Sequence, residues 1–392
     1  MSQAIPIENI DQRFRLATPK HDVWLLAVVV FLITFGLVMV ASASIPIAER
    51  YGQSELHYFW RQVIAVALGS SLAFVIMQIP LLFWQKTSSL FLLVAIVLLA
   101  AVLVPGLGRE VNGSLRWLDL GAFTIQASEP AKFAVIIYIG AYFVRHLEHV
   151  RSEFLGFIKP IGVLTVISAL LLLEPDFGAS TVMFATALGM LFIAGVAITR
   201  FIAWGLVALA FLCTLTLLAP YRMQRLMAFR DPWADPFDSG FQLTQALIAF
   251  GRGEWFGVGL GNSIQKLFYL PEVHTDFLFA VIGEEFGLFG SLIVIASFLF
   301  LVWRIFFIAS LAESKRHIFA AYSAYGIGLL IGFEAFINIG VNIGLLPTKG
   351  LTLPLMSYGS NSMVVILVMI GFVLRVEKEA RDPDAAEVVS VG

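Results

Sequence analysis

Two charged side chains stand together at the start of an apolar run. Glu129 and Lys132 are three residues apart, so on a helix they share one face. Arg109 and Arg116 precede them in a polar segment that contains glycine. The three cations together could bind an anionic substrate such as a pyrophosphate. The alternative is a capped helix with a local ion pair, which needs no ligand.

A second group of acids surrounds the start of a later apolar run. We expect Asp276 in the first turn of that helix, at the membrane surface. An aspartate there commonly caps a helix, yet a carboxylate at the wet rim of an apolar bundle is also well placed as a general base. Glu284 and Glu285 follow about 12 Å deeper along a helix. Acids at that depth are costly unless they are paired, so they indicate a polar interior or a water-filled cleft.

Two further polar patterns fall within or between apolar runs. Glu334, Asn338 and Asn342 recur every four residues and make one helix face polar. That stripe predicts either interhelical hydrogen bonding or a substrate groove. Glu174 and Asp176 lie in a sharp break between two apolar runs, where they are either exposed turn residues or part of a site.

Several other classes of site find no support. The glycine-rich segment at 251–259 has no neighbouring strand and no Walker lysine, so it does not indicate a nucleotide site. His146 and His149 have no partner ligands in the sequence, and we expect no metal site there. A formal net charge of −2 gives no indication of nucleic acid binding.

The composition defines the elements that must position these residues. The chain has 392 residues, of which 59% are hydrophobic and 13% are charged, and its mean hydropathy is +0.90. A soluble chain would be roughly 25% charged. Apolar runs long enough to cross a ~30 Å hydrocarbon core recur along the sequence. The fold class predicted is therefore all-α: a polytopic membrane protein with about ten transmembrane helices and one long extracytoplasmic loop. We expect these helices at roughly 23–43, 60–79, 88–105, 130–146, 157–174, 178–197, 200–219, 276–303, 318–342 and 353–375.

The distribution of Lys and Arg predicts the orientation of the helices. More than half of the 25 Lys and Arg residues fall on the side of the membrane that holds both termini, which is therefore the cytoplasmic side. We expect a cytoplasmic N-terminal tail at 1–22, a ten-helix membrane domain at 23–375 and a cytoplasmic tail at 376–392. The long polar connection at 220–275 then faces outward.

Several stretches match motifs of a known family. They are GREVNGSLRWLDLG at 108–121, IQASEPAK at 125–132, EPDFG at 174–178, PYRMQRLMAFRDPWADPF at 220–237, GFQLTQALIAFGRGEWFGVGLGNSIQKLFYLPEVHTDFLFAVIGEEFG at 240–287 and NIGVNIGLLPTKGLTLPLMSYGS at 338–360. On these stretches the chain resembles the SEDS proteins (shape, elongation, division and sporulation). The DPWADPF and GNSIQK segments resemble the division-specific members. Ala127 stands where proline is usual, and Ser360-Asn361 where Gly-Ser is expected, so local loop geometry departs from the pattern while the charged positions are kept.

The resemblance implies a peptidoglycan glycosyltransferase that polymerises lipid II, an undecaprenyl-pyrophosphate-linked disaccharide-pentapeptide, into glycan strands for septal cell-wall synthesis. The family's essential aspartate matches Asp276, which would act as general base in an inverting reaction. The acid and base of the family's SEPAK-like motif match Glu129 and Lys132. The predicted substrate-binding residues are Glu129, Lys132, Arg109, Arg116, Glu284, Glu334 and Asn338.

Partners and location also follow from the resemblance. They are a class B penicillin-binding transpeptidase (FtsI), the FtsQ–FtsL–FtsB group, and the bacterial inner membrane at the division septum. No cofactor is implied with certainty, and a divalent cation (Mg or Mn) stays open. The alternative functions are a lipid II flippase and a scaffold for the division machinery. Asp276 at one surface favours chemistry, whereas the polar stripe and the buried acids favour transport.

Overall fold

A computed structural model of the chain describes residues 22–111, 114–119, 121, 124–217, 229–238, 240–348 and 350–381. The N-terminal tail before residue 22, the chain after 381 and the start of the long loop at 218–228 lie outside this description. Each predicted apolar helix has a counterpart in it. They are α1 (Val23–Arg50), α2 (His57–Gln78), α3 (Leu81–Val102), α4 (Ser128–Ser152), α5 (Phe154–Leu173), α6 (Phe177–Ile193), α7 (Ile198–Leu217), α10 (Leu278–Ser314), α11 (Ile318–Asn342) and α12 (Ser360–Arg381).

The predicted membrane character of these helices is confirmed. Within the described ranges, eight of them are long and apolar enough to cross a membrane, and shorter apolar helices occupy Phe177–Ile193 and Ile198–Val207. Helix ends differ from the prediction because apolar composition marks only the part of a helix that lies in lipid. Thus α3 begins at Leu81 rather than 88, and α10 continues to Ser314 rather than 303. Helix α12 instead begins later than predicted, at Ser360 rather than 353, because the apolar residues before it, such as Leu353 and Leu355, are buried in a non-helical segment.

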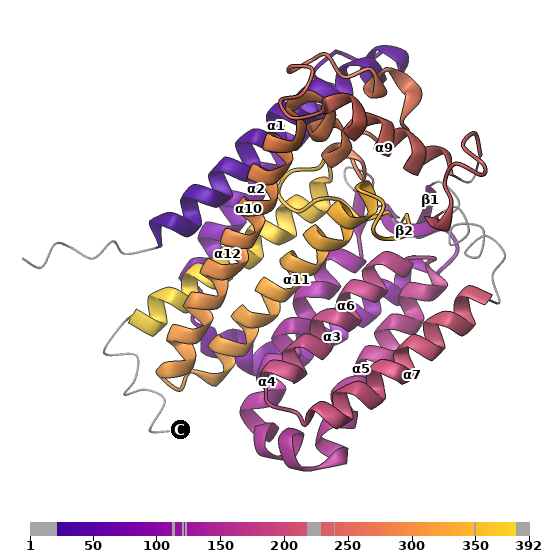
Figure 1. Ribbon diagram of the computed structural model, residues 1–392. Coiled ribbons are helices and arrows are strands. Elements are labelled where there is room, and N and C mark those ends of the chain that lie inside the picture. The colour runs from indigo at the N-terminus through magenta and orange to yellow at the C-terminus, as the bar shows by residue number, and fades with distance from the viewer. Residues whose placement is uncertain are drawn as a thin grey trace, which may run out of the picture.

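The helices form two groups that α11 joins. Figure 1 shows the first two helices beside the last three, with α3 to α7 on the other side of the bundle. Segments from opposite ends of the sequence are neighbours, because α2 packs on α12 and α1 packs on α10. Helix α11 packs against α10 on one side and against α4 and α6 on the other. A polar side chain on α11 can therefore reach both groups.

A small antiparallel sheet lies between α3 and α4 and was not predicted. Its strands are β1 (Gly108–Val111), β2 (Ser114–Asp119) and β3 (Thr124–Gln126), in the order β1-β2-β3. Arg116 and Leu118 share one face of β2 because side chains alternate along a strand. Leu118 is buried, so this face of the strand is turned toward the protein and carries Arg116 with it.

The long loop contributes helix α9 (Phe241–Gly253) and a short π-helical turn, η2 (Gln265–Tyr269), and it packs on α10. Helix α10 is interrupted at Gly287, where φ is 67° and ψ is −159°. The loop supplies backbone hydrogen bonds at this break. Val258 donates to the Glu284 carbonyl at 3.0 Å, and Leu288 donates to the Glu254 carbonyl at 2.9 Å. This exchange satisfies backbone groups that an interrupted helix would otherwise leave unpaired in the membrane.

The two acids beside this break are paired inside the protein. Glu284 accepts hydrogen bonds from Arg252 at 2.6 Å and from the Ser263 hydroxyl. Glu285 accepts from Lys266 at 2.9 Å. Both carboxylates are buried, and their partners all belong to the long loop or to Ser42 of α1. The predicted polar interior is therefore present here as a set of fixed ion pairs that hold the loop against α10 and α1.

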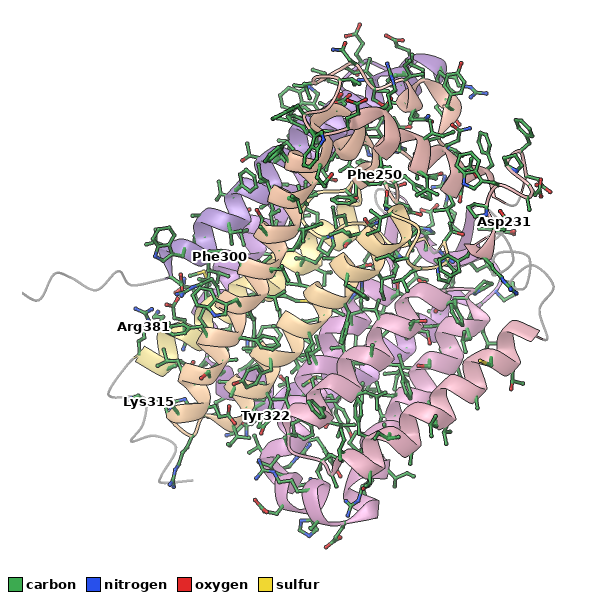
Figure 2. All side chains as sticks on the ribbon, in the orientation of Figure 1. Asp231, Phe250, Phe300, Lys315, Tyr322 and Arg381 are labelled. Carbon is green, nitrogen blue, oxygen red and sulfur yellow. The ribbon has the colours of Figure 1, made fainter. Side chains whose placement is uncertain are left out.

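The opposite end of the bundle is closed by another ionic network. Asp22 caps α1, pairs with Arg304 of α10, and donates its backbone N–H to Glu377 of α12 at 2.8 Å. Figure 2 shows Lys315 and Arg381 at this end, away from Phe250 and Asp231 at the end that carries the long loop. The two ends of the bundle thus differ in kind: one is tied by salt bridges between helices, and the other carries the loop and the sheet.

Candidate functional site

A buried ion triad joins α4 to α11. The Lys132 ammonium donates to Glu129 Oε1 at 2.9 Å and to Glu334 of α11. All three side chains are buried, with residue exposures of 3%, 6% and 3% for Lys132, Glu129 and Glu334. The sequence pattern predicted that Glu129 and Lys132 share a face, and the structure adds Glu334 as a second carboxylate. The ammonium therefore links the two helices, and the predicted roles of these three residues in substrate binding stay predictions.

Two asparagines of α11 hold the backbone of Asp276. The Asn338 amide donates to the Asp276 carbonyl at 2.8 Å and to the Leu351 carbonyl at 2.6 Å. The Asn342 amide donates to the same Asp276 carbonyl at 3.0 Å, and its oxygen accepts from the Ala280 N–H at 3.0 Å. The polar stripe therefore makes interhelical contacts, as one of its two readings predicted, and these contacts fix the start of α10.

Asp276 is not the residue that caps α10. The N-cap position belongs to Phe277, which makes no side-chain cap hydrogen bond, and Asn342 of α11 satisfies the Ala280 N–H instead. The Asp276 side chain is half-buried. Its backbone is held by the two asparagines of α11 through its carbonyl, and its role as a general base stays a prediction.

The Asp276 carboxylate and the Arg116 guanidinium approach a common space above Gly350. A Cβ atom built on Gly350 would lie 3.3 Å from Asp276 Oδ2 and 4.0 Å from Arg116 Nη1. Gly350 is exposed and contributes no side chain of its own here. A carboxylate and a guanidinium therefore both lie close to the same backbone position.

Arg116 also contacts the turn between α5 and α6. Its Nη2 donates to the Pro175 carbonyl at 2.5 Å. Glu174 and Asp176, on either side of that proline, are both buried, so the interpretation of these acids as exposed turn residues is wrong. Asp176 caps α6 by accepting from the Ala179 N–H at 3.1 Å.

His274 lies two residues before Asp276 in an aromatic setting. Its ring is buried near the rings of Tyr58 and Tyr358, at centroid distances of 5.0 and 5.4 Å. Burial lowers the pKa of this imidazole, against a smaller opposing effect of Glu272. At neutral pH His274 therefore adds no positive charge beside Asp276.

The remaining predicted residues lie elsewhere. Arg109 is largely exposed and pairs with Asp119 of β2 at 3.7 Å. Glu284 is engaged with the long loop, as described above. Neither contact brings these side chains to the space above Gly350, and their roles in substrate binding stay predictions. Within the described residues, no group of three or more His, Cys, Asp or Glu side chains is arranged to hold a metal ion.

Sequence reasoning missed Asn342 as a site residue, the burial of Glu174, and Gly350. Asn342 had a signal, because it continues the spacing of Glu334 and Asn338. Gly350 had none, since its importance depends on two side chains that approach it from distant parts of the chain.

The fold and the site define a polytopic membrane protein with a charged site at the end of the bundle that carries the long loop. The family model described as "Cell cycle protein", FtsW/RodA/SpoVE, matches residues 23–382, and the chain belongs to this family.

Relatives and solved structures agree with this assignment. A protein of Hahella chejuensis named "Probable peptidoglycan glycosyltransferase FtsW" is 51% identical over 370 residues, which cover 94% of this chain and 93% of that protein. A protein of Nitrosococcus halophilus with the same name is 53% identical over 371 residues, covering 94% and 95%. A chain of a peptidoglycan synthase complex, in a structure described as "Structural coordination of polymerization and crosslinking", superposes with a TM-score of 0.75 at 27% identity, covering 94% and 99%. The rod shape determining protein RodA of Thermus thermophilus superposes with a TM-score of 0.68 at 26% identity and the same coverage.

The ion triad predicts a large structural effect at Lys132. Lys132→Met leaves two buried carboxylates without their cation, and we expect it to lower the free energy of unfolding by about 3–5 kcal/mol. Thermal unfolding in detergent measures this loss. A triple variant that adds Glu129→Gln and Glu334→Gln removes the uncompensated charges and should recover much of the stability. An unchanged melting temperature for Lys132→Met alone would show that the triad does not hold the helices.

Proposed function

We propose that this chain is a peptidoglycan glycosyltransferase that polymerises lipid II at the outer surface of the bacterial inner membrane. The observation that carries the proposal is the approach of the Asp276 carboxylate and the Arg116 guanidinium to one position at Gly350. A base and a cation facing one space match what a glycosyl transfer to a hydroxyl, with a pyrophosphate leaving group, requires. The names of relatives that are about half identical to this chain support the same activity.

The proposed reaction needs one base and one stabilised leaving group. The 4-hydroxyl of the acceptor sugar attacks the anomeric carbon of the donor, and Asp276 takes the hydroxyl proton. The new C–O bond forms as the bond from the anomeric carbon to the pyrophosphate oxygen breaks, and the electron pair leaves with lipid pyrophosphate. Arg116 stabilises the charge that develops on that oxygen. An α-linked donor gives a β-linked product, so the reaction inverts the configuration.

The contacts of the buried polar groups favour this reaction over lipid flipping. A transport groove needs polar groups that a moving headgroup can use. Glu284 and Glu285 are instead paired with Arg252 and Lys266 of the loop. The asparagines of α11 bond to backbone atoms. The features of the sequence that favoured a flippase are therefore engaged in fixed contacts.

We also propose the orientation and the partners of the chain. The end that carries the long loop, the sheet and Asp276 faces outward, and both termini are cytoplasmic. The chain works at the division septum with the transpeptidase FtsI and the FtsQ–FtsL–FtsB group. The similarity to a chain of a complex described by its polymerization and crosslinking supports a transpeptidase partner.

Replacing the proposed base tests the activity. Asp276→Asn keeps the shape of the side chain but cannot accept the proton, and we expect polymerisation to fall by about 10²–10⁴-fold. The measurement is the formation of glycan strands from labelled lipid II by purified protein with FtsI. The backbone carbonyl of residue 276 still accepts from Asn338 and Asn342 in this variant, so we expect the start of α10 to stay in place, and thermal unfolding checks that the variant is folded.

Asp238→Asn, which changes an exposed acid of the same loop, is the matched control and should leave strand formation unchanged. Strand formation by Asp276→Asn at the wild-type rate would show that Asp276 is not the base.

Orientation is tested with single cysteines in a Cys213→Ser background. Asp238 is exposed at the loop end, and Ser314 is exposed at the other end of α10. We expect a cysteine at 238 to react with a membrane-impermeant thiol reagent in intact spheroplasts, and a cysteine at 314 to react only after lysis. The reverse pattern would place Asp276 on the cytoplasmic side and contradict the proposed orientation.

A further inference from the structure

Glu174 is a buried carboxyl group that the proposed reaction does not yet use. It ends α5, and its residue exposure is 0%. Neither of its carboxyl oxygens has a hydrogen-bond partner among the described residues. A buried carboxyl that lacks a hydrogen bond to the described residues is costly, so the group calls for a partner from outside them.

Arg116 has an unused donor beside the same turn. Its Nη2 bonds to the Pro175 carbonyl, directly after Glu174, while its Nε is buried and has no partner. The two side chains are neighbours of opposite formal charge, yet no hydrogen bond joins them. The guanidinium spans the distance from this turn to the space above Gly350, where its Nη1 lies near the Asp276 carboxylate.

We propose that Glu174, as the neutral acid, is a second hydrogen-bond donor for the phosphate group that Arg116 binds. The carboxyl O–H and the guanidinium Nε–H would both donate to oxygens of the lipid pyrophosphate. An anion with several acceptor oxygens satisfies both donors at once, whereas a sugar hydroxyl offers fewer acceptors. This inference rests on the proposed function, because it names how the same site holds its substrate.

The surroundings of Glu174 keep it protonated at neutral pH. Burial raises its pKa to about 8, with a further rise from Asp176 and an opposing effect of Arg116. The charged groups near this turn include Asp176 of α6, Arg116 of β2, Asp276 before α10, and the triad of Glu129, Lys132 and Glu334 on α4 and α11. Below about pH 8 the group is an O–H donor. Above that pH it is a carboxylate, which repels phosphate and competes for Arg116.

The experiment measures the affinity of the purified full-length protein in nanodiscs for undecaprenyl pyrophosphate from pH 6.5 to 9.5. For wild type we expect affinity to fall by about tenfold per pH unit above the pKa of Glu174, because binding then requires the uptake of one proton. Glu174→Gln cannot ionise but can still donate a hydrogen bond. Its affinity should stay within about tenfold of wild type at low pH and should show no fall at high pH.

Two further variants sharpen the test. Asp176→Asn removes the neighbouring charge that raises the pKa of Glu174, so the fall in affinity should begin at lower pH than in wild type. Glu148→Gln changes an exposed acid at the other end of α4 and should leave the profile unchanged. The inference would be overturned if the affinity of Glu174→Gln fell with rising pH as steeply as that of wild type. It would also be overturned if wild type did not bind undecaprenyl pyrophosphate at any pH.

Strand formation at pH 7 in the same samples separates this inference from the proposed function. If wild type forms strands but its affinity for undecaprenyl pyrophosphate has the same pH profile as that of Glu174→Gln, the inference is overturned and the proposed polymerase activity stands. Wild type that binds pyrophosphate with the Glu174 profile, but forms no strands with FtsI at any pH, supports the inference and overturns the polymerase.

Discussion

The position of the site depends on one buried ammonium. Lys132 of α4 lies between Glu129 on its own helix and Glu334 on α11, and all three side chains are buried. Charges in such a place must be satisfied by one another, so the register of α4 against α11 is fixed wherever the three groups meet. A shift of one helix along the other by a single turn would move the ammonium about 5.4 Å from its partner and leave a bare charge in the membrane.

That fixed register also sets the positions of two asparagines, one and two turns after Glu334 on α11. Asn338 and Asn342 follow Glu334 on the same face, and both donate to the Asp276 carbonyl. The backbone of the proposed base is therefore held by the helix that the ion triad positions. From the other side, the pairs formed by Glu284 and Glu285 hold the long loop against the broken part of α10. Polar groups buried inside the bundle thus hold the end of the bundle at which Asp276 and Arg116 approach Gly350.

The sequence predicts some of these features and not others, for reasons that are physical. Apolar runs predict the helices because only a helix satisfies its own backbone in lipid, and a spacing of three residues puts Glu129 and Lys132 on one face. The same rule cannot pair Glu334 with Lys132, because the two residues are 202 positions apart and meet only through the packing of α11 on α4. The sequence likewise left Asp276 as either a helix cap or a general base. It could not decide between them because the N–H of Ala280, in the first turn of α10, is satisfied by Asn342 from another helix. The burial of Glu174 depends on how the sheet and the α5–α6 turn come together, which no local pattern encodes.

The central claim is that reaction occurs in the space between Asp276 and Arg116, and Gly350 gives the most direct access to it. A methyl group added at Gly350 would lie 3.3 Å from the Asp276 carboxylate and 4.0 Å from Arg116, and a leucine side chain would occupy the space itself. The measurement is the rate of glycan strand formation by the purified Gly350→Ala and Gly350→Leu variants, compared with wild type. The control is Gly162→Ala, because a methyl group at Gly162 meets nothing within 4 Å. We expect a loss of strand formation that grows from alanine to leucine, at unchanged thermal stability and with Gly162→Ala at the wild-type rate. Wild-type strand formation by Gly350→Leu would contradict it.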